Sequence, residues 1–116
     1  MTIIRTGDRP VLERAPARPT LQRLVDRENG SQSVTVLVNR SSDAQAVPEH
    51  THEVEEVLLV TDGECTVSVD GRRTVAQAGD AVIVRPGATH SIATDANGSC
   101  TVVAVLGSAD ATIWSE

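Results

Sequence analysis

The closely spaced histidines His50 and His52 are the strongest chemical signal in this sequence. Side chains two residues apart point in nearly opposite directions on a helix but in the same direction on a β-strand. On a strand, both imidazoles can therefore bind one metal ion. Glu56 has the same parity, whereas Glu53 and Glu55 have the opposite parity and are expected to face solvent or the other layer. Two imidazoles and a carboxylate form a facial arrangement that holds transition metals with coordination positions left open.

His90 is the third and last histidine of the chain. It follows a Pro-Gly turn at residues 86–87, at the expected start of a strand, where the turn can aim it at the other two histidines. Leu58 and Val60 have the parity of Glu56, so we expect them to form an apolar wall beside the ligands. The alternative is that the histidines are ordinary surface residues and that the acids around Glu56 are only a solvated run.

Short β-strands separated by turn residues dominate the chain after residue 33. Asp-Gly pairs at 62–63 and 70–71 are strong hairpin signals, and further turns are expected at 79–80, 86–87 and 97–98. Many short strands at spacings of roughly 8–12 residues favour a β-sandwich or a small barrel. The expected strands are 33–39, 54–61, 65–70, 74–78, 81–85, 91–94 and 101–106.

The N-terminal segment differs from the rest of the chain in charge. Six arginines and three acidic residues give residues 1–27 a charge of +3, whereas residues 28–116 carry −9. Three prolines in the segment break any long helix. We therefore expect one domain over residues 1–116, with an extended Arg- and Pro-rich arm over 1–30, a short element near 21–25, and a barrel core over about 31–108. The arginines of the arm either meet an acidic partner or substrate, or lie solvated against the acidic domain or a second subunit.

The composition excludes several kinds of chemistry. The chain has no Lys, Tyr or Phe, and Trp114 is its only aromatic residue, so lysine Schiff-base catalysis and base stacking on aromatic side chains are not expected. The net charge of −6 opposes nucleic-acid binding. No apolar run approaches the roughly 18 residues of a membrane span, and no secretory signal is visible, so we expect a cytoplasmic protein without membrane or nucleic-acid partners. Cys65 and Cys100 are expected to be free and buried, and Cys65 is also a candidate pocket residue.

Two segments resemble the sequence motifs of the cupin superfamily. Residues 50–63, HTHEVEEVLLVTDG, match a first motif of H-x-H, Glu and Gly, and residues 79–90, GDAVIVRPGATH, are similar to a second motif of Gly, P-x-G and His. The chain departs from the family pattern at Ala44, Arg85 and Thr94, where Gly, Pro and Asn are frequent, but none of these positions is a candidate ligand. Arg85 either binds a carboxylate or phosphate of the substrate or faces solvent across a turn.

The resemblance implies an all-β fold, a jelly-roll barrel (double-stranded β-helix) that is usually a homodimer. It also implies one divalent transition metal per chain (Fe, Mn, Ni, Cu or Zn) with two coordination positions left for water, dioxygen or a bidentate substrate. The implied turn glycines with positive φ are Gly63, Gly79 and Gly87. The implied ligands are His50, His52, Glu56 and His90.

We expect a mononuclear metal-dependent oxidoreductase of the dioxygenase type that acts on a small chelating organic substrate, because the ligand set suits redox-active metals and leaves positions open. The first alternative is a non-oxidative lyase, isomerase or hydrolase that uses the metal as a Lewis acid on a sugar or small acid. The lack of aromatic residues leaves little surface on which a sugar could stack. The second alternative is a small-molecule-binding protein without catalysis.

Overall fold

Antiparallel β-strands make up most of the protein, which we describe from a computed structural model. The structure describes residues 1–13 and 17–111, so Trp114 lies outside the described residues. No helix in the described part of the chain is long and apolar enough to cross a membrane. The 3₁₀ helices are Thr6–Asp8 and Arg27–Asn29, and the strands are β1 (Thr20–Val25), β2 (Thr35–Ser42), β3 (Ala46–His50), β4 (Glu56–Val69), β5 (Arg72–Gln77), β6 (Ala81–Val84), β7 (His90–Ala93) and β8 (Ser99–Leu106).

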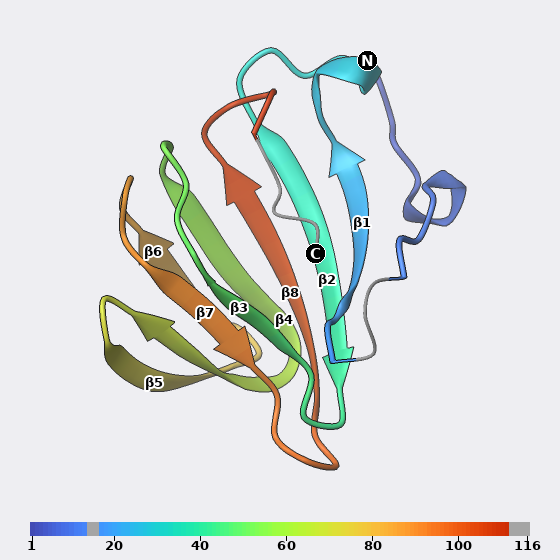
Figure 1. Ribbon diagram of the computed structural model, residues 1–116. Coiled ribbons are helices and arrows are strands. Elements are labelled where there is room, and N and C mark those ends of the chain that lie inside the picture. Colours follow the sequence, from blue (N-terminus) through green and yellow to red (C-terminus); the bar gives the residue numbers. More distant parts are fainter. Residues whose placement is uncertain (14–16, 112–116) are drawn as a thin grey trace.

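The strands form one curled antiparallel sheet in the order β1-β2-β8-β4-β7-β3, with β5 and β6 also paired to β4 (Figure 1). The long strand β4 pairs with different strands along its two parts. Its residues 56–63 pair with β8 and its residues 56–59 also with β6, whereas residues 64–69 pair with β5 and residues 66–69 also with β7. We call β1, β2, β8, β6 and the first part of β4 the large half, and β3, β5, β7 and the second part of β4 the small half.

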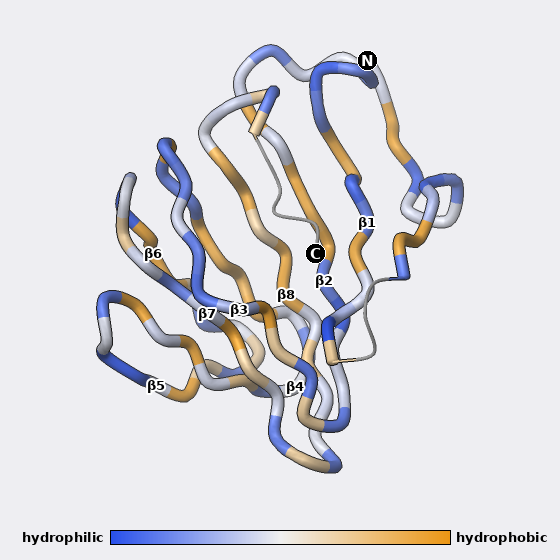
Figure 2. Tube along the Cα trace, viewed as in Figure 1, coloured by the Kyte–Doolittle hydropathy of each residue, from blue (hydrophilic) through white to orange (hydrophobic). Residues whose placement is uncertain are grey.

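The hydrophobic core lies between these two halves. Alternate residues of β4 and β8 point inward because side chains alternate along a strand. They are almost fully buried, and Figure 2 shows the apolar stretches along both strands. The inward residues of β8 are Cys100, Val102, Ala104 and Leu106. Cys65 and Cys100 are free and buried, as expected from the sequence.

The Asp-Gly pair at residues 62–63 does not end a strand, so the two strands expected over 54–61 and 65–70 are one. The register between β4 and β8 shifts between Val60 and Asp62, which marks a β-bulge. A bulge bends a strand without ending it, and this one lies where β4 passes from the large half to the small half. The Asp-Gly pair at 70–71 does form a hairpin, with φ of 49° at Asp70 and 81° at Gly71. Gly79 and Gly87 adopt positive φ in turns, as expected, whereas Gly63 has positive φ within β4 instead of in a turn at a strand end.

Part of the expected N-terminal arm belongs to the sheet. The short element expected near residues 21–25 is β1, which pairs antiparallel with β2. Leu21 is 3% exposed and belongs to the core. The buried Gln22 amide donates hydrogen bonds to the backbone carbonyls of Thr6 and Arg9, so the preceding residues lie against β1. The sheet therefore begins before residue 31, because an apolar strand is stabilised by burial whatever the charge of its flanking residues.

The turn between β2 and β3 contains a strained alanine. Asp43 and Ala44 have φ of 51° and 65°, and the Gln45 N–H donates to the Ser42 carbonyl at 3.1 Å. Two residues with positive φ inside such a turn define type I′, which favours glycine at the second position. Ala44 is one of the positions at which the sequence departs from the cupin pattern.

Replacing Ala44 by glycine is expected to stabilise the protein by about 0.5–1 kcal/mol. Relief of a left-handed strain of roughly 1–2 kcal/mol exceeds the entropy that glycine adds to the unfolded chain. Urea unfolding measures the effect. Ala46→Gly, in β3, is the control and should destabilise the protein, since a strand residue gains nothing from glycine. Equal destabilisation by both substitutions would contradict the interpretation of the turn.

Candidate metal centre

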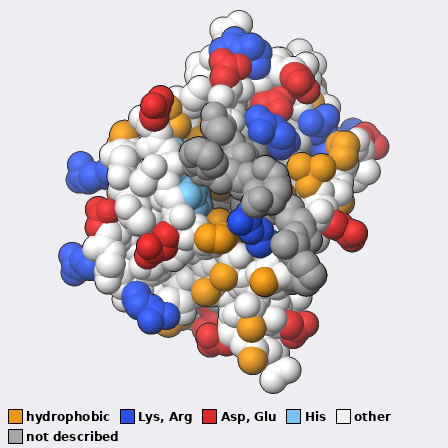
Figure 3. Space-filling model, in the orientation of Figure 1, with side chains coloured by type: hydrophobic (Ala, Val, Ile, Leu, Met, Phe, Trp, Pro, Cys, Tyr) orange, Lys and Arg blue, Asp and Glu red, His pale blue; other side chains and the backbone are white. Residues whose placement is uncertain are grey.

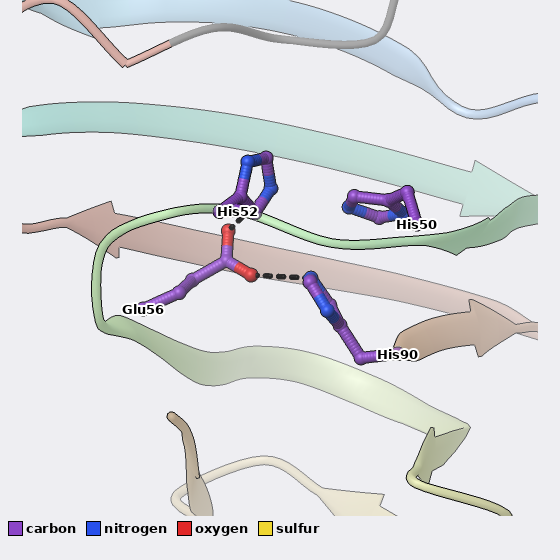
Figure 4. Close-up of side chains that lie close together, drawn as sticks. All are labelled: His50, His52, Glu56 and His90. Carbon is purple, nitrogen blue, oxygen red and sulfur yellow. Dashed lines mark ion pairs between the residues drawn. The ribbon is translucent and has the colours of Figure 1, made fainter. Parts of the chain in front are cut away.

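Four side chains converge between the two halves of the sheet: His50, His52, Glu56 and His90 (Figure 4). One ligand atom from each residue lies within 4.8 Å of those from the other three. The ring centroids of His50 and His90 are 4.1 Å apart, and those of His50 and His52 are 4.9 Å apart. Imidazoles and one carboxylate at these separations form a cluster that can hold a metal ion.

Three strands and one connection position these residues. His50 ends β3, and its partner across the strand pair is His90, the first residue of β7. Glu56 is the first residue of β4 in the large half, and His52 lies in the connection between β3 and β4. The parity argument placed His50, His52 and Glu56 on one face of a single extended strand, and this placement is wrong. The chain leaves β3 after His50 and turns, and this turn brings Glu56 back toward the histidines.

Distant backbone groups hold the connection between β3 and β4. The Gly87 N–H donates to the His52 carbonyl at 2.8 Å, and the Gly107 N–H donates to the Glu55 carbonyl at 2.9 Å. Glu53 and Glu55 are exposed, as expected from the sequence. The side chain of Glu56 is therefore directed inward by a backbone that is fixed at both sides.

Backbone carbonyls orient two of the imidazoles. His50 Nδ1 lies 2.7 Å from the Pro48 carbonyl oxygen, and His90 Nδ1 lies 3.0 Å from the Ala88 carbonyl oxygen. A carbonyl accepts only, so Nδ1 carries the proton in both rings and donates it. This arrangement leaves Nε2 as the ligand atom and is typical of metal-binding histidines.

Glu56 and His90 form a buried contact that requires a cation or a proton. His90 Nε2 lies 2.8 Å from Glu56 Oε1, and His52 Nε2 lies 3.9 Å from Glu56 Oε2. His90 Nε2 and Glu56 Oε1 are both buried and have no conventional hydrogen-bond partner. With the proton of a neutral His90 on Nδ1, two lone pairs would face each other, which is unfavourable in a buried site. The donor set thus fits a transition-metal ion, which would satisfy both atoms.

Protonation of the imidazoles follows from the same contacts. Burial lowers the pKa of His50, which favours the neutral form that binds metals. Burial also acts to lower the pKa of His90, but the interactions with the Glu56 carboxylate and the Ala88 carbonyl outweigh it and raise that pKa. In the absence of a metal, a proton between Glu56 and His90 is therefore favoured, and a bound metal would displace it.

A cavity of about 750 Å³ opens beside the cluster, and histidine is visible from solvent on this face of the molecule (Figure 3). Leu58 lines the cavity, as expected, together with Leu21 and Leu37. Val60 is 1% exposed and packs in the core instead of lining the cavity. The half-buried Arg18 also lines the cavity, and no acidic residue in the described ranges forms an ion pair with it. In the sequence, only the positive charge of the N-terminal arm pointed to a role for Arg18.

Two residues that the sequence singled out lie away from this cavity. Arg85 is exposed and lines a different cavity. Cys65 is 3% exposed in the core and is absent from the lining of the cavity beside the cluster. Burial, followed by a hydrogen bond with Cys100, raises the pKa of the Cys65 thiol to about 12. The reactive thiolate form of Cys65 is therefore scarce at neutral pH, which argues against a role as a nucleophile.

Solved structures with this fold were found at low sequence identity. The polyketide cyclase RemF from Streptomyces resistomycificus is 21% identical with a TM-score of 0.83, over 97% of this chain and 82% of that one. A predicted oxalate decarboxylase from Thermotoga maritima is 19% identical with a TM-score of 0.80, over 92% and 99%. KdgF from Halomonas sp. is 13% identical with a TM-score of 0.78, over 95% and 96%. These likenesses confirm the jelly-roll fold.

Sequence comparison gives the family directly. No curated protein matches the chain at a significant level. The Cupin domain family matches residues 37–106, which is more than half of the 116 residues and includes all four residues of the cluster. Together with the all-β fold and the two motifs, this match shows that the chain belongs to the cupin family.

Proposed function

We propose that this protein is a mononuclear metal-dependent enzyme that acts on a small chelating organic anion. The single observation that carries the proposal is the buried contact between Glu56 Oε1 and His90 Nε2, at 2.8 Å, within a cluster of three imidazoles. A transition metal held by His50, His52, Glu56 and His90 would supply Lewis-acid chemistry and, if it is redox-active, electron transfer.

The other cavity residues act by excluding water and by charge. Leu21, Leu37 and Leu58 form apolar walls, which lower the local dielectric and strengthen electrostatic interactions with a bound substrate. The Arg18 guanidinium can form paired hydrogen bonds with a carboxylate, so it favours an anionic substrate. Glu56 and the histidines are the titratable groups at the cluster itself, and they can hold or move a proton there.

The first candidate reaction is a dioxygenase-type oxidation. Its support is the ligand set of three histidines and one glutamate, which suits iron, manganese, nickel and copper. Protein loaded anaerobically with Fe(II), Mn(II), Ni(II) or Cu(II) is expected to consume oxygen when a chelating enol, diketone or 2-oxo acid is added. An oxygen electrode measures the rate, and the Glu56→Gln variant under identical loading is the control. Oxygen consumption by none of the four loaded forms would contradict the oxidative reaction.

The second candidate reaction is non-oxidative, and the names of the structural neighbours favour it. Those names are a polyketide cyclase and a predicted oxalate decarboxylase. If protein loaded with redox-inert Zn(II) shows full turnover and consumes no oxygen, the non-oxidative reaction is supported. Tight binding of a chelating anion without turnover under either loading would instead indicate a binding protein, and would leave the metal centre itself intact.

A further inference from the structure

A second cavity is lined by residues of β4, β5 and β6. Strands β5 and β6 lie on the side of the molecule away from β1 (Figure 1). The volume of the second cavity is about 550 Å³, and it shares no lining residue with the cavity of the metal centre. Its apolar surface comes from Val67 and Val69 of β4, Val82 and Ile83 of β6, and Ala88. Volumes of this order and largely apolar walls are typical of small-molecule sites.

The polar lining of this second cavity is basic although the protein is acidic. Arg72, Arg73 and Arg85 contribute three positive charges, and Asp70 contributes one negative charge. The lining therefore carries +2 in a chain whose net charge is −6. Three of the ten arginines thus line a single cavity, which gives it a positive potential opposite to that of the whole molecule.

These three guanidinium groups are not neutralised within the described part of the chain. The ion pairs found there involve Arg23 and Arg27, not the arginines of the second cavity. Asp70, the acid in the lining, accepts a hydrogen bond at Oδ1 from the Thr89 N–H at 3.0 Å, and no ion pair among the described residues joins it to these arginines. The guanidinium donors are therefore available to an anion from solution.

The backbone that carries two of these arginines is fixed. Arg72 pairs with Val69 across the two-residue hairpin that joins β4 and β5. Arg85 begins a turn closed by a hydrogen bond from the Ala88 N–H to the Arg85 carbonyl, at 3.1 Å. Binding an anion would therefore order side chains but not loops, which limits the entropic cost of binding.

We propose that the second cavity binds a small organic anion, namely a carboxylate or phosphate that carries a short apolar chain. The acidic group is held by Arg72 and Arg85, since guanidinium groups bind such oxygens in pairs. The apolar chain lies against Val67, Val69 and Val82. The site is independent of the metal and of the proposed reaction.

Isothermal titration calorimetry with hexanoate and with hexyl phosphate tests this proposal. Hexanamide, which lacks the charge, and inorganic phosphate, which lacks the apolar chain, are the control ligands. Both amphiphilic anions are expected to bind, or one of them if the site selects carboxylate or phosphate, and each control ligand is expected to bind more weakly. Arg72→Gln and Arg85→Gln should each weaken binding about tenfold. Arg5→Gln changes the net charge equally from an exposed position outside the cavity and should leave the affinity unchanged. Circular dichroism checks that each variant is folded.

Any of these results would overturn the proposal: no binding of either amphiphilic anion by the parent protein, hexanamide bound as tightly as hexanoate, or equal losses in Arg5→Gln and Arg85→Gln. A His50→Ala variant separates this site from the metal centre. It should bind the anions as the parent does. Loss of binding in that variant would place the anion at the metal centre, which would refute the second site while supporting the proposed function.

Discussion

Replacing Glu56 by alanine is expected to lower the affinity for a divalent transition metal by about 100-fold or more. The substitution removes the only carboxylate of the cluster and leaves His90 Nε2 buried without its charged neighbour. Substituting a group that only hydrogen-bonds to a metal ligand lowers the metal affinity by about 10–100-fold. Loss of a ligand itself should lower the metal affinity at least as much. Elemental analysis after gel filtration measures the retained metal, and competition with a chromophoric chelator gives the affinity.

Glu55→Ala is a closely matched control for this prediction. Glu55 precedes Glu56 in the same connection and has the same side chain, but it is exposed and contributes only its backbone carbonyl to the local structure. The control should retain metal like the parent protein. Alanine substitution of His50, His52 or His90 should resemble Glu56→Ala. If Glu56→Ala and Glu55→Ala retained equal amounts of metal, the proposed centre would be wrong, and with it the proposed function.

The residues of the candidate metal centre were predictable, but the way in which they converge was not. Residue types and spacing identified His50, His52, Glu56 and His90 because few side chains bind transition metals. Strand parity explained their convergence incorrectly, since nothing local shows that the chain turns after His50. The contacts that hold the turn come from Gly87 and Gly107, which lie far along the sequence. Arg18 was missed as an individual residue for the same reason, because only the packing of β1 on the sheet brings it to the cavity.

The fold class followed from alternation and turn residues, whereas the strand boundaries depended on packing. The Asp-Gly pairs at 62–63 and 70–71 look alike in sequence, and both give the hairpin signal. The second makes a hairpin because β5 pairs back on β4 directly after it. The first continues β4 because β8 pairs with the residues that precede it and with the Asp-Gly pair itself, from Glu56 to Gly63. The distinction depends on a neighbouring strand that the local sequence does not reveal.

That neighbouring strand leaves no room for a side chain at residue 63. A Cβ atom on Gly63 would lie 2.0 Å from the Ser99 carbonyl oxygen, 2.9 Å from the Ser99 carbonyl carbon and 3.1 Å from the Cys100 Cα atom. These are backbone atoms of β8, so a rotamer change cannot relieve the overlap. The φ of 72° at Gly63 adds the strain of a left-handed conformation.

The Gly63→Ala variant is therefore expected to lose about 3 kcal/mol or more of its free energy of unfolding, a large share of the roughly 5–15 kcal/mol typical of a domain. Urea unfolding followed by circular dichroism measures the loss. Gly71→Ala is the control, because Gly71 has a similar φ of 81° but nothing within 4 Å of its added Cβ, so it should lose only about 1–2 kcal/mol. Equal losses would mean that β4 and β8 separate easily at the bulge. A markedly larger loss at Gly63 would show that close contact between β4 and β8 keeps β4 a single strand. Glu56 and the part of β4 in the small half then belong to the same strand.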